Sequence, residues 1–171
     1  MELIIDPACS VAFEMEPEER DVMQRPPRNP RARLFTRILV VRSLLQGIGA
    51  LAAAALVFGV SMRSGLIETD VRMLTFTTLI VTNLLLIVTN RSLTRPTLAD
   101  WWTPNPALRW LGAGALAILA LILYVPFIRD LFRMSRPHAD DALVIAAAGV
   151  GALVWMELVK RYSPSTQGDR S

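Results

Sequence analysis

Four long apolar runs constrain the fold of this chain more than any other feature of its sequence. A hydrocarbon core about 30 Å thick is crossed by about 20 mostly apolar helical residues. Runs of this kind occupy residues 38–61, 73–88, 110–127 and 142–159. With 53% hydrophobic residues and a mean hydropathy of +0.40, the chain is too apolar for an ordinary soluble domain of 171 residues. The expected fold class is all-α: a polytopic membrane helix bundle with four transmembrane helices plus an N-terminal half-helix.

Basic residues in the segments that flank the spans predict how the helices are oriented. If the segment before residue 38 is cytoplasmic, twelve Lys and Arg residues fall on the cytoplasmic side and five on the other, with Arg42 left out because it lies inside a span. Cytoplasmic loops carry the excess of Lys and Arg, so both ends of the four-helix unit are predicted to be cytoplasmic. We expect an integral membrane protein, located in the plasma (inner) membrane.

The rest of the chain divides by composition. Residues 1–14 are mostly apolar but too few to cross a bilayer, so they are interpreted as the remnant of a membrane helix. Residues 15–37 form a Pro- and Arg-rich cytoplasmic connector in which the prolines exclude a long helix. Residues 38–162 make up the four-span membrane domain, and the polar residues 163–171 are predicted to be a disordered cytoplasmic tail.

The segment before the first span resembles a known family. Its sequence, residues 2–35, is ELIIDPACSVAFEMEPEERDVMQRPPRNPRARLF. It is similar to the end of the sixth transmembrane helix and the following loop of type II, calcium-pump-like P-type ATPases, and residues 21–28 match their D-x-M-x-R-P-P-R signature. By this resemblance the four spans correspond to helices seven to ten. The resemblance implies the C-terminal membrane domain of a cation-transporting ATPase, which contributes helices and part of the cation site.

The catalytic motifs of that family do not occur in the sequence. Its cycle needs an Asp-Lys-Thr-Gly-Thr phosphorylation motif, a nucleotide-binding domain and a Thr-Gly-Glu loop, and neither these nor a Walker A loop is present. No residue is therefore predicted to be catalytic, and the isolated chain is expected not to hydrolyse ATP. We expect no cofactor in this chain itself, with ATP and Mg²⁺ bound only by the missing domains.

Two carboxylates near the N-terminus are the first candidates for cation binding. Glu2 and Asp6 stand at i and i+4, so in a helix they lie on one face and can offer oxygens to one hard cation. Pro7 would leave a backbone carbonyl one turn earlier without its helical partner. By resemblance, Glu2 and Asp6 fall on positions that coordinate the transported ion, expected to be Ca²⁺, although the first position is generally Asn in calcium pumps. The alternative is that this short stretch lies at the membrane interface with both carboxylates solvated.

Polar residues inside two spans are the remaining candidates. Asn83 aligns, by resemblance, with a ligand position of the eighth helix that is Glu in calcium pumps, and Thr78 and Thr82 on adjacent turns are possible support. The alternative is that all three simply hydrogen-bond neighbouring helices. In the first span, the polar residues are interpreted as an opening turn whose side chains reach the interface. They are Arg42, Ser43 and Gln46. No metal site beyond that of the transported cation is predicted, and His138 beside Asp140 and Asp141 is interpreted as solvated.

Three functions stay open at this point. The first is a module of a cation pump, with the N-terminal part of the pump as its partner. The second is a stand-alone small integral membrane protein that binds another membrane protein, and the third is a non-functional pump fragment, as a start at Met1 inside a membrane helix suggests. Because the basic residues lie between apolar runs rather than in one patch, the lipid bilayer and not nucleic acid is the expected surface.

Overall fold

The computed structural model describes Glu14, residues 37–90 and residues 105–162. Within the long described ranges the chain forms helices α2 (Arg37–Arg63), α3 (Glu68–Asn90), α5 (Pro106–Tyr124), α6 (Pro126–Leu131) and α7 (Ala139–Tyr162). These ranges contain no strand, and the predicted all-α fold is confirmed. The predicted remnant helix (except Glu14), the connector up to residue 36 and the C-terminal tail lie outside the described residues.

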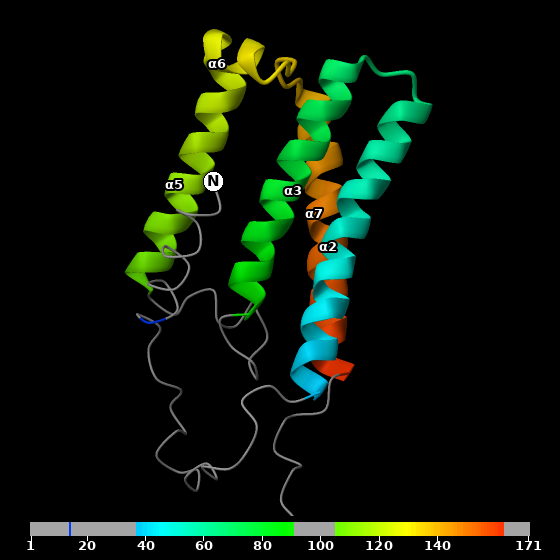
Figure 1. Ribbon diagram of the computed structural model, residues 1–171, viewed down its shortest axis with the longest axis vertical. Coiled ribbons are helices and arrows are strands. Elements are labelled where there is room, and N and C mark those ends of the chain that lie inside the picture. The colour runs from blue at the N-terminus through cyan, green and yellow to red at the C-terminus, as the bar shows by residue number, and fades with distance from the viewer. Residues whose placement is uncertain (1–13, 15–36, 91–104, 163–171) are drawn as a thin grey trace, which may run out of the picture.

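Four of these helices are long and apolar enough to cross a membrane. They are α2, α3, α5 and α7, with 27, 23, 19 and 24 residues. The shortest spans about 28 Å at a rise of 1.5 Å per residue, close to the thickness of a hydrocarbon core. At most 33% of the most apolar window of any of the four is buried inside the protein, so most of their apolar surface is available to lipid. Figure 1 shows the four helices running side by side. Within the described residues, the four predicted transmembrane helices are therefore confirmed.

The third span ends earlier than predicted. Helix α5 stops at Tyr124, three residues before the predicted end at residue 127, and Val125 takes extended angles of φ −82° and ψ 114°. Pro126 is the cause, because its ring excludes the residue before it from the helical region and its nitrogen has no hydrogen to donate. The chain then starts the short helix α6, which Figure 1 shows turning away from the direction of α5 at one end of the bundle.

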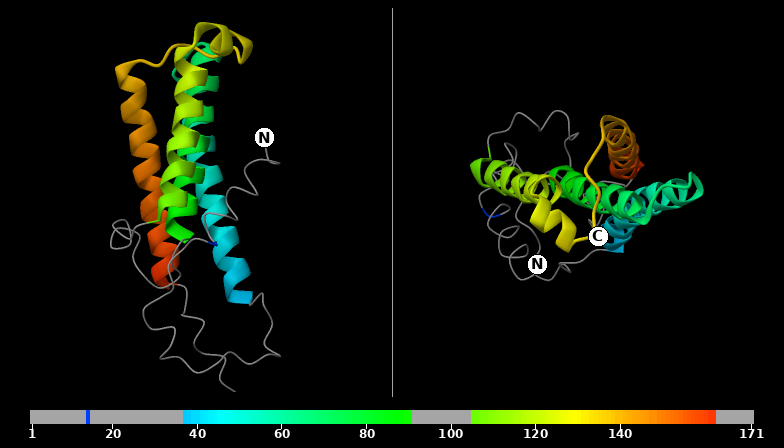
Figure 2. Two further views of the ribbon diagram at one scale, coloured as in Figure 1. Left: turned by 90° about the vertical axis from the view of Figure 1, so that its left-hand side faces the viewer. Right: turned by 90° about the horizontal axis from the view of Figure 1, so that it is seen from above.

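Three helices make the core of the bundle, and the fourth lies at its edge. Helices α2, α3 and α7 each pack against the other two, whereas α5 packs against α3 and α6. The views in Figures 1 and 2 agree that α5 stands beside α3 at the edge. The start of α2 and the end of α7 lie at one end of the bundle, which we call the inner end. Met73 and Leu74 of α3 are buried among residues of α2 and α5, and Met156 of α7 is buried with Ala50 and Ala152.

Candidate functional site

Two of the candidate residues, Thr78 and Thr82, lie inside the bundle with exposed fractions of 0%. The Thr82 hydroxyl donates to the backbone oxygen of Thr78 at 2.9 Å and to that of Leu79 at 3.1 Å. Thr82 therefore satisfies its hydroxyl within its own helix, a common arrangement for threonine inside a span, rather than by the predicted alternative of a bond to a neighbouring helix. The Thr78 hydroxyl is buried without a hydrogen-bond partner in the described part of the chain.

Asn83 lies on a different face of α3. Its side chain is exposed, whereas Thr82 beside it is fully buried. At 3.6 residues per turn, position 83 is about 100° from position 82 and about 140° from position 78. The structure therefore does not bring the three side chains into one polar strip: the threonines face the packed core and Asn83 faces outward. Glu2 and Asp6, the other candidate ligands, lie outside the described residues.

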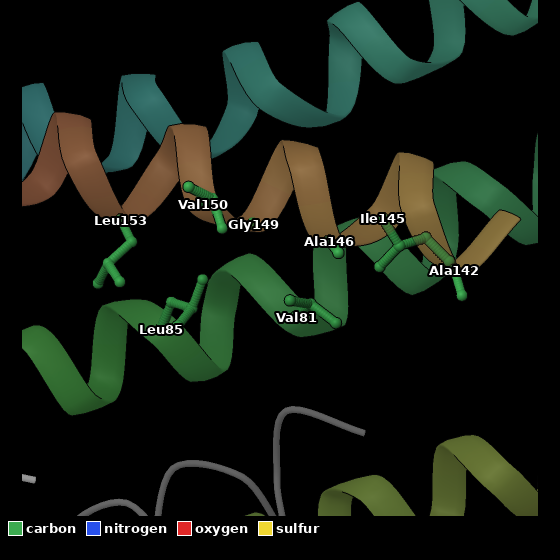
Figure 3. Close-up of a pocket in the computed structure, with 8 residues that line it drawn as sticks. All are labelled: Val81, Leu85, Ala142, Ile145, Ala146, Gly149, Val150 and Leu153. Carbon is green, nitrogen blue, oxygen red and sulfur yellow. The ribbon is translucent and has the colours of Figure 1, made fainter. Parts of the chain in front are cut away.

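A shallow groove between α3 and α7 is apolar throughout. It encloses about 450 Å³. Figure 3 shows its lining residues, which include Val81 and Leu85 of α3 and Ala146, Gly149, Val150 and Leu153 of α7. These side chains supply no oxygen or nitrogen atom, so the groove cannot replace the hydration shell of a cation. It is not a candidate cation site.

The first span contains two buried polar residues whose role the sequence interpretation missed. Arg42 and Gln46 are only 8% and 1% exposed, so the prediction that they reach the interface is wrong, while Ser43 between them is exposed. Glu157 of α7 is close enough to Arg42 to interact with it electrostatically. The four-residue spacing could have revealed this burial. Residues 42 and 46 lie on the same helix face as the small residues Ala50 and Ala54, and this is the buried face of α2. In a membrane protein, small residues mark the side of a helix that packs against other helices, and a polar residue on that side is expected to be buried in the interface.

Further polar contacts join α3 to α7 at the inner end. The Lys160 ammonium donates to the backbone oxygen of Thr89 at 3.2 Å. The buried Thr89 hydroxyl donates to the sulfur of Met156, a weak acceptor, at 3.8 Å. Because a backbone carbonyl in the last turn of a helix has no partner within the helix, Lys160 fills a hydrogen-bonding position that α3 itself leaves open.

His138 and Asp141 form the start of α7. The His138 backbone N–H donates to the Asp141 carboxylate at 2.7 Å, which is one half of a capping box. The His138 imidazole nitrogen is 3.6 Å from the same carboxylate. Among the described residues, no group of three or more His, Cys, Asp or Glu side chains is placed to hold a metal ion. The structure thus gives Asp141 a part in helix initiation.

Replacing Asp141 tests this capping role. Asp141→Ala is expected to lower the free energy of unfolding by about 0.5–2 kcal/mol, because the N–H of His138 loses its acceptor. The measurement is the midpoint of unfolding in a titration with sodium dodecyl sulfate. Asp140→Ala is the matched control, since it removes the same charge from the same turn. Equal effects of the two variants would contradict the cap and leave only the interaction of charge with the helix dipole.

Comparison with known proteins identifies the family that contains these four spans. The protein-family model described as "Cation transporting ATPase, C-terminus" matches residues 1–162. The chain belongs to this family. The match runs from the N-terminal segment to the last residue of α7, and it confirms the resemblance to the C-terminal membrane domain of a cation-transporting ATPase.

Individual proteins similar to this cation-transporting ATPase C-terminus are calcium-transporting ATPases. Calcium-transporting ATPase type 2C member 1 of Homo sapiens is 21% identical over 96% of this chain. Calcium-transporting ATPase 1 of Lactococcus lactis is 28% identical over 92% of the chain, and the protein of the same name in Yarrowia lipolytica is 25% identical over 94%. The chain spans only about 18% of the length of the curated relatives it matches.

Proposed function

We propose that this chain supplies the last four membrane spans of an ATP-driven calcium pump and acts together with the remaining part of such a pump. Membership of the family supports this, because the relatives named above are calcium-transporting ATPases in which the matched region is a small share of the length. In this proposal, phosphorylation and the binding of ATP and Mg²⁺ take place in the other part of the pump. The chain alone hydrolyses no ATP.

The exposed amide of Asn83 is the structural observation that carries the proposal. An amide that faces hydrocarbon without a hydrogen-bond partner loses about 2–7 kcal/mol relative to water. Since Asn83 lies within a membrane-spanning helix and outside the packed face of this bundle, we infer that further protein covers this face of α3.

We propose that Asn83 is one ligand of the cation site. Asn83 would contribute an amide oxygen, and Glu2 and Asp6 would contribute carboxylate oxygens, the ligand types that Ca²⁺ prefers. Thr78 and Thr82 would act through packing, since both are buried in the core of this chain and not on the face of Asn83. We also propose that the pump lies in the plasma membrane with the inner end of this bundle on the cytoplasmic side, as the excess of basic residues favours.

The test is to express the chain with and without the complementary N-terminal part of a calcium pump, such as the relative from Lactococcus lactis. Only the combined preparation is expected to form a Ca²⁺-dependent phosphoenzyme from labelled ATP. Asp6→Ala should abolish it, and Asn83→Ala should raise the Ca²⁺ concentration for half-maximal phosphorylation about tenfold, the equivalent of 1.4 kcal/mol.

A matched control is Asn90→Ala, whose amide donates to the backbone oxygen of Leu86 within α3. This variant is expected to leave the Ca²⁺ dependence unchanged. If both parts insert and associate but no phosphoenzyme forms, the transport role is wrong. If the phosphoenzyme forms and Asn83→Ala, like Asn90→Ala, leaves its Ca²⁺ dependence unchanged, the chain is a pump module without a ligand at position 83.

A further inference from the structure

Gln46 of α2 places a primary amide inside the three-helix core without a hydrogen-bond partner. Its exposed fraction is 1%, and neither its Nε2 nor its Oε1 atom has a partner in the described part of the chain. An amide can donate two hydrogen bonds and accept two. Leaving a buried polar group unsatisfied is costly, so a side chain in this state indicates a ligand that supplies both a donor and an acceptor.

The surroundings of Gln46 differ on its two sides along the helix. One turn toward the inner end is Arg42, also buried, with Glu157 of α7 in electrostatic range. One turn in the other direction is Ala50, which packs with Ala152 and Met156 of α7 in an apolar cluster. Gln46 therefore lies at the boundary between a polar inner end and an apolar cluster of alanine and methionine side chains.

The charges around Gln46 select the kind of ligand. Arg42 and Glu157 carry opposite charges, so together they favour neither a cation nor an anion, and a small neutral molecule is the kind of ligand that suits this position. The molecule must also donate and accept hydrogen bonds at one position. Water has this chemistry, and ionisable residues within membrane bundles typically face the interior or a water-filled space.

We infer that water enters the core between α2, α3 and α7 from the inner end and is bound by the amide of Gln46, with Arg42 lining the route. Gln46 is nine residues beyond Arg37, the first residue of α2, which places the bound water about 14 Å along the helix. Beyond it, Ala50 and Met156 close the route. This inference does not depend on calcium transport, because it rests on the packing of this chain alone.

The reactivity of introduced cysteines tests how far water penetrates along α2. In a Cys9→Ser background reconstituted in lipid vesicles, Gln46→Cys and Ala50→Cys are treated with the small neutral reagent 2-hydroxyethyl methanethiosulfonate. A thiol reacts through its thiolate, which forms only in contact with water. We expect Gln46→Cys to react at least tenfold faster than Ala50→Cys, which lies one turn deeper on the same face. Equal rates would overturn the inference.

A second measurement covers the case in which a cysteine variant fails to fold. If water satisfies the amide, Gln46→Leu removes a satisfied group, and the unfolding midpoint in sodium dodecyl sulfate should stay unchanged or fall. If the core is dry, the same variant removes unsatisfied polar atoms and the midpoint should rise. A rise would overturn the inference. Water-edited solid-state NMR should also show transfer from water to a side-chain amide signal that disappears in Gln46→Leu, and no transfer would contradict the bound water.

Discussion

Gly49→Ala is expected to destabilise the bundle by about 2–4 kcal/mol. A Cβ atom at position 49 would overlap the indole ring of Trp155 from α7. The same indole donates to the backbone oxygen of Leu45 at 2.8 Å, one turn earlier on α2, so it cannot move without losing this bond. Overpacking costs about 1–3 kcal/mol and the lost hydrogen bond about 0.5–1.5 kcal/mol. The measurement is the unfolding midpoint in sodium dodecyl sulfate, converted to a free energy.

Two comparisons isolate this contact. Gly47→Ala makes the same change two residues away, where a Cβ would meet nothing within 4 Å, and is expected to be neutral or slightly stabilising because alanine favours helix. In a Trp155→Ala background, Gly49→Ala should also lose its effect, since the ring that it displaces is gone. A full effect of Gly49→Ala without the indole would show that another contact is responsible.

Met73→Ala is expected to lower the free energy of unfolding by about 2 kcal/mol. Met73 of α3 has an exposed fraction of 0% and lies in the core cluster that includes Val57 of α2 and Leu119 of α5. Truncating such a side chain in a water-soluble core costs about 2–5 kcal/mol. The lower end applies here because lipid is as apolar as methionine, which leaves mainly the lost packing contacts.

Met62→Ala is the matched control for this substitution. Met62 of α2 is 54% exposed, so its removal leaves no internal cavity. The unfolding midpoint of Met62→Ala should stay within the error of the parent protein. Similar losses in the two variants would mean that position 73 is not enclosed by the other helices, which would contradict the packing of α5 and α2 against α3.

The number and approximate position of the spans, and the family of the chain, could be predicted from the amino-acid sequence. Hydropathy over about 20 residues is a local property that a bilayer converts directly into a helix, because every backbone group must be bonded within its own segment. This reasoning located α2, α3 and α7 within a few residues. For α5 it predicted a start four residues after Pro106 and an end three residues after Tyr124, because the run remains apolar on both sides of Pro126.

Which side of each span faces protein is apparent only from the packing of the helices. In a bilayer both faces of a helix are apolar, so sequence pattern distinguishes them poorly, and α2 and α7 are apolar nearly all round. Thr78 and Asn83 belong to one polar run in the sequence, yet packing buries the first and leaves the second outside. Packing likewise encloses Arg42 and Gln46, because the small residues on their face of α2 let α7 approach closely.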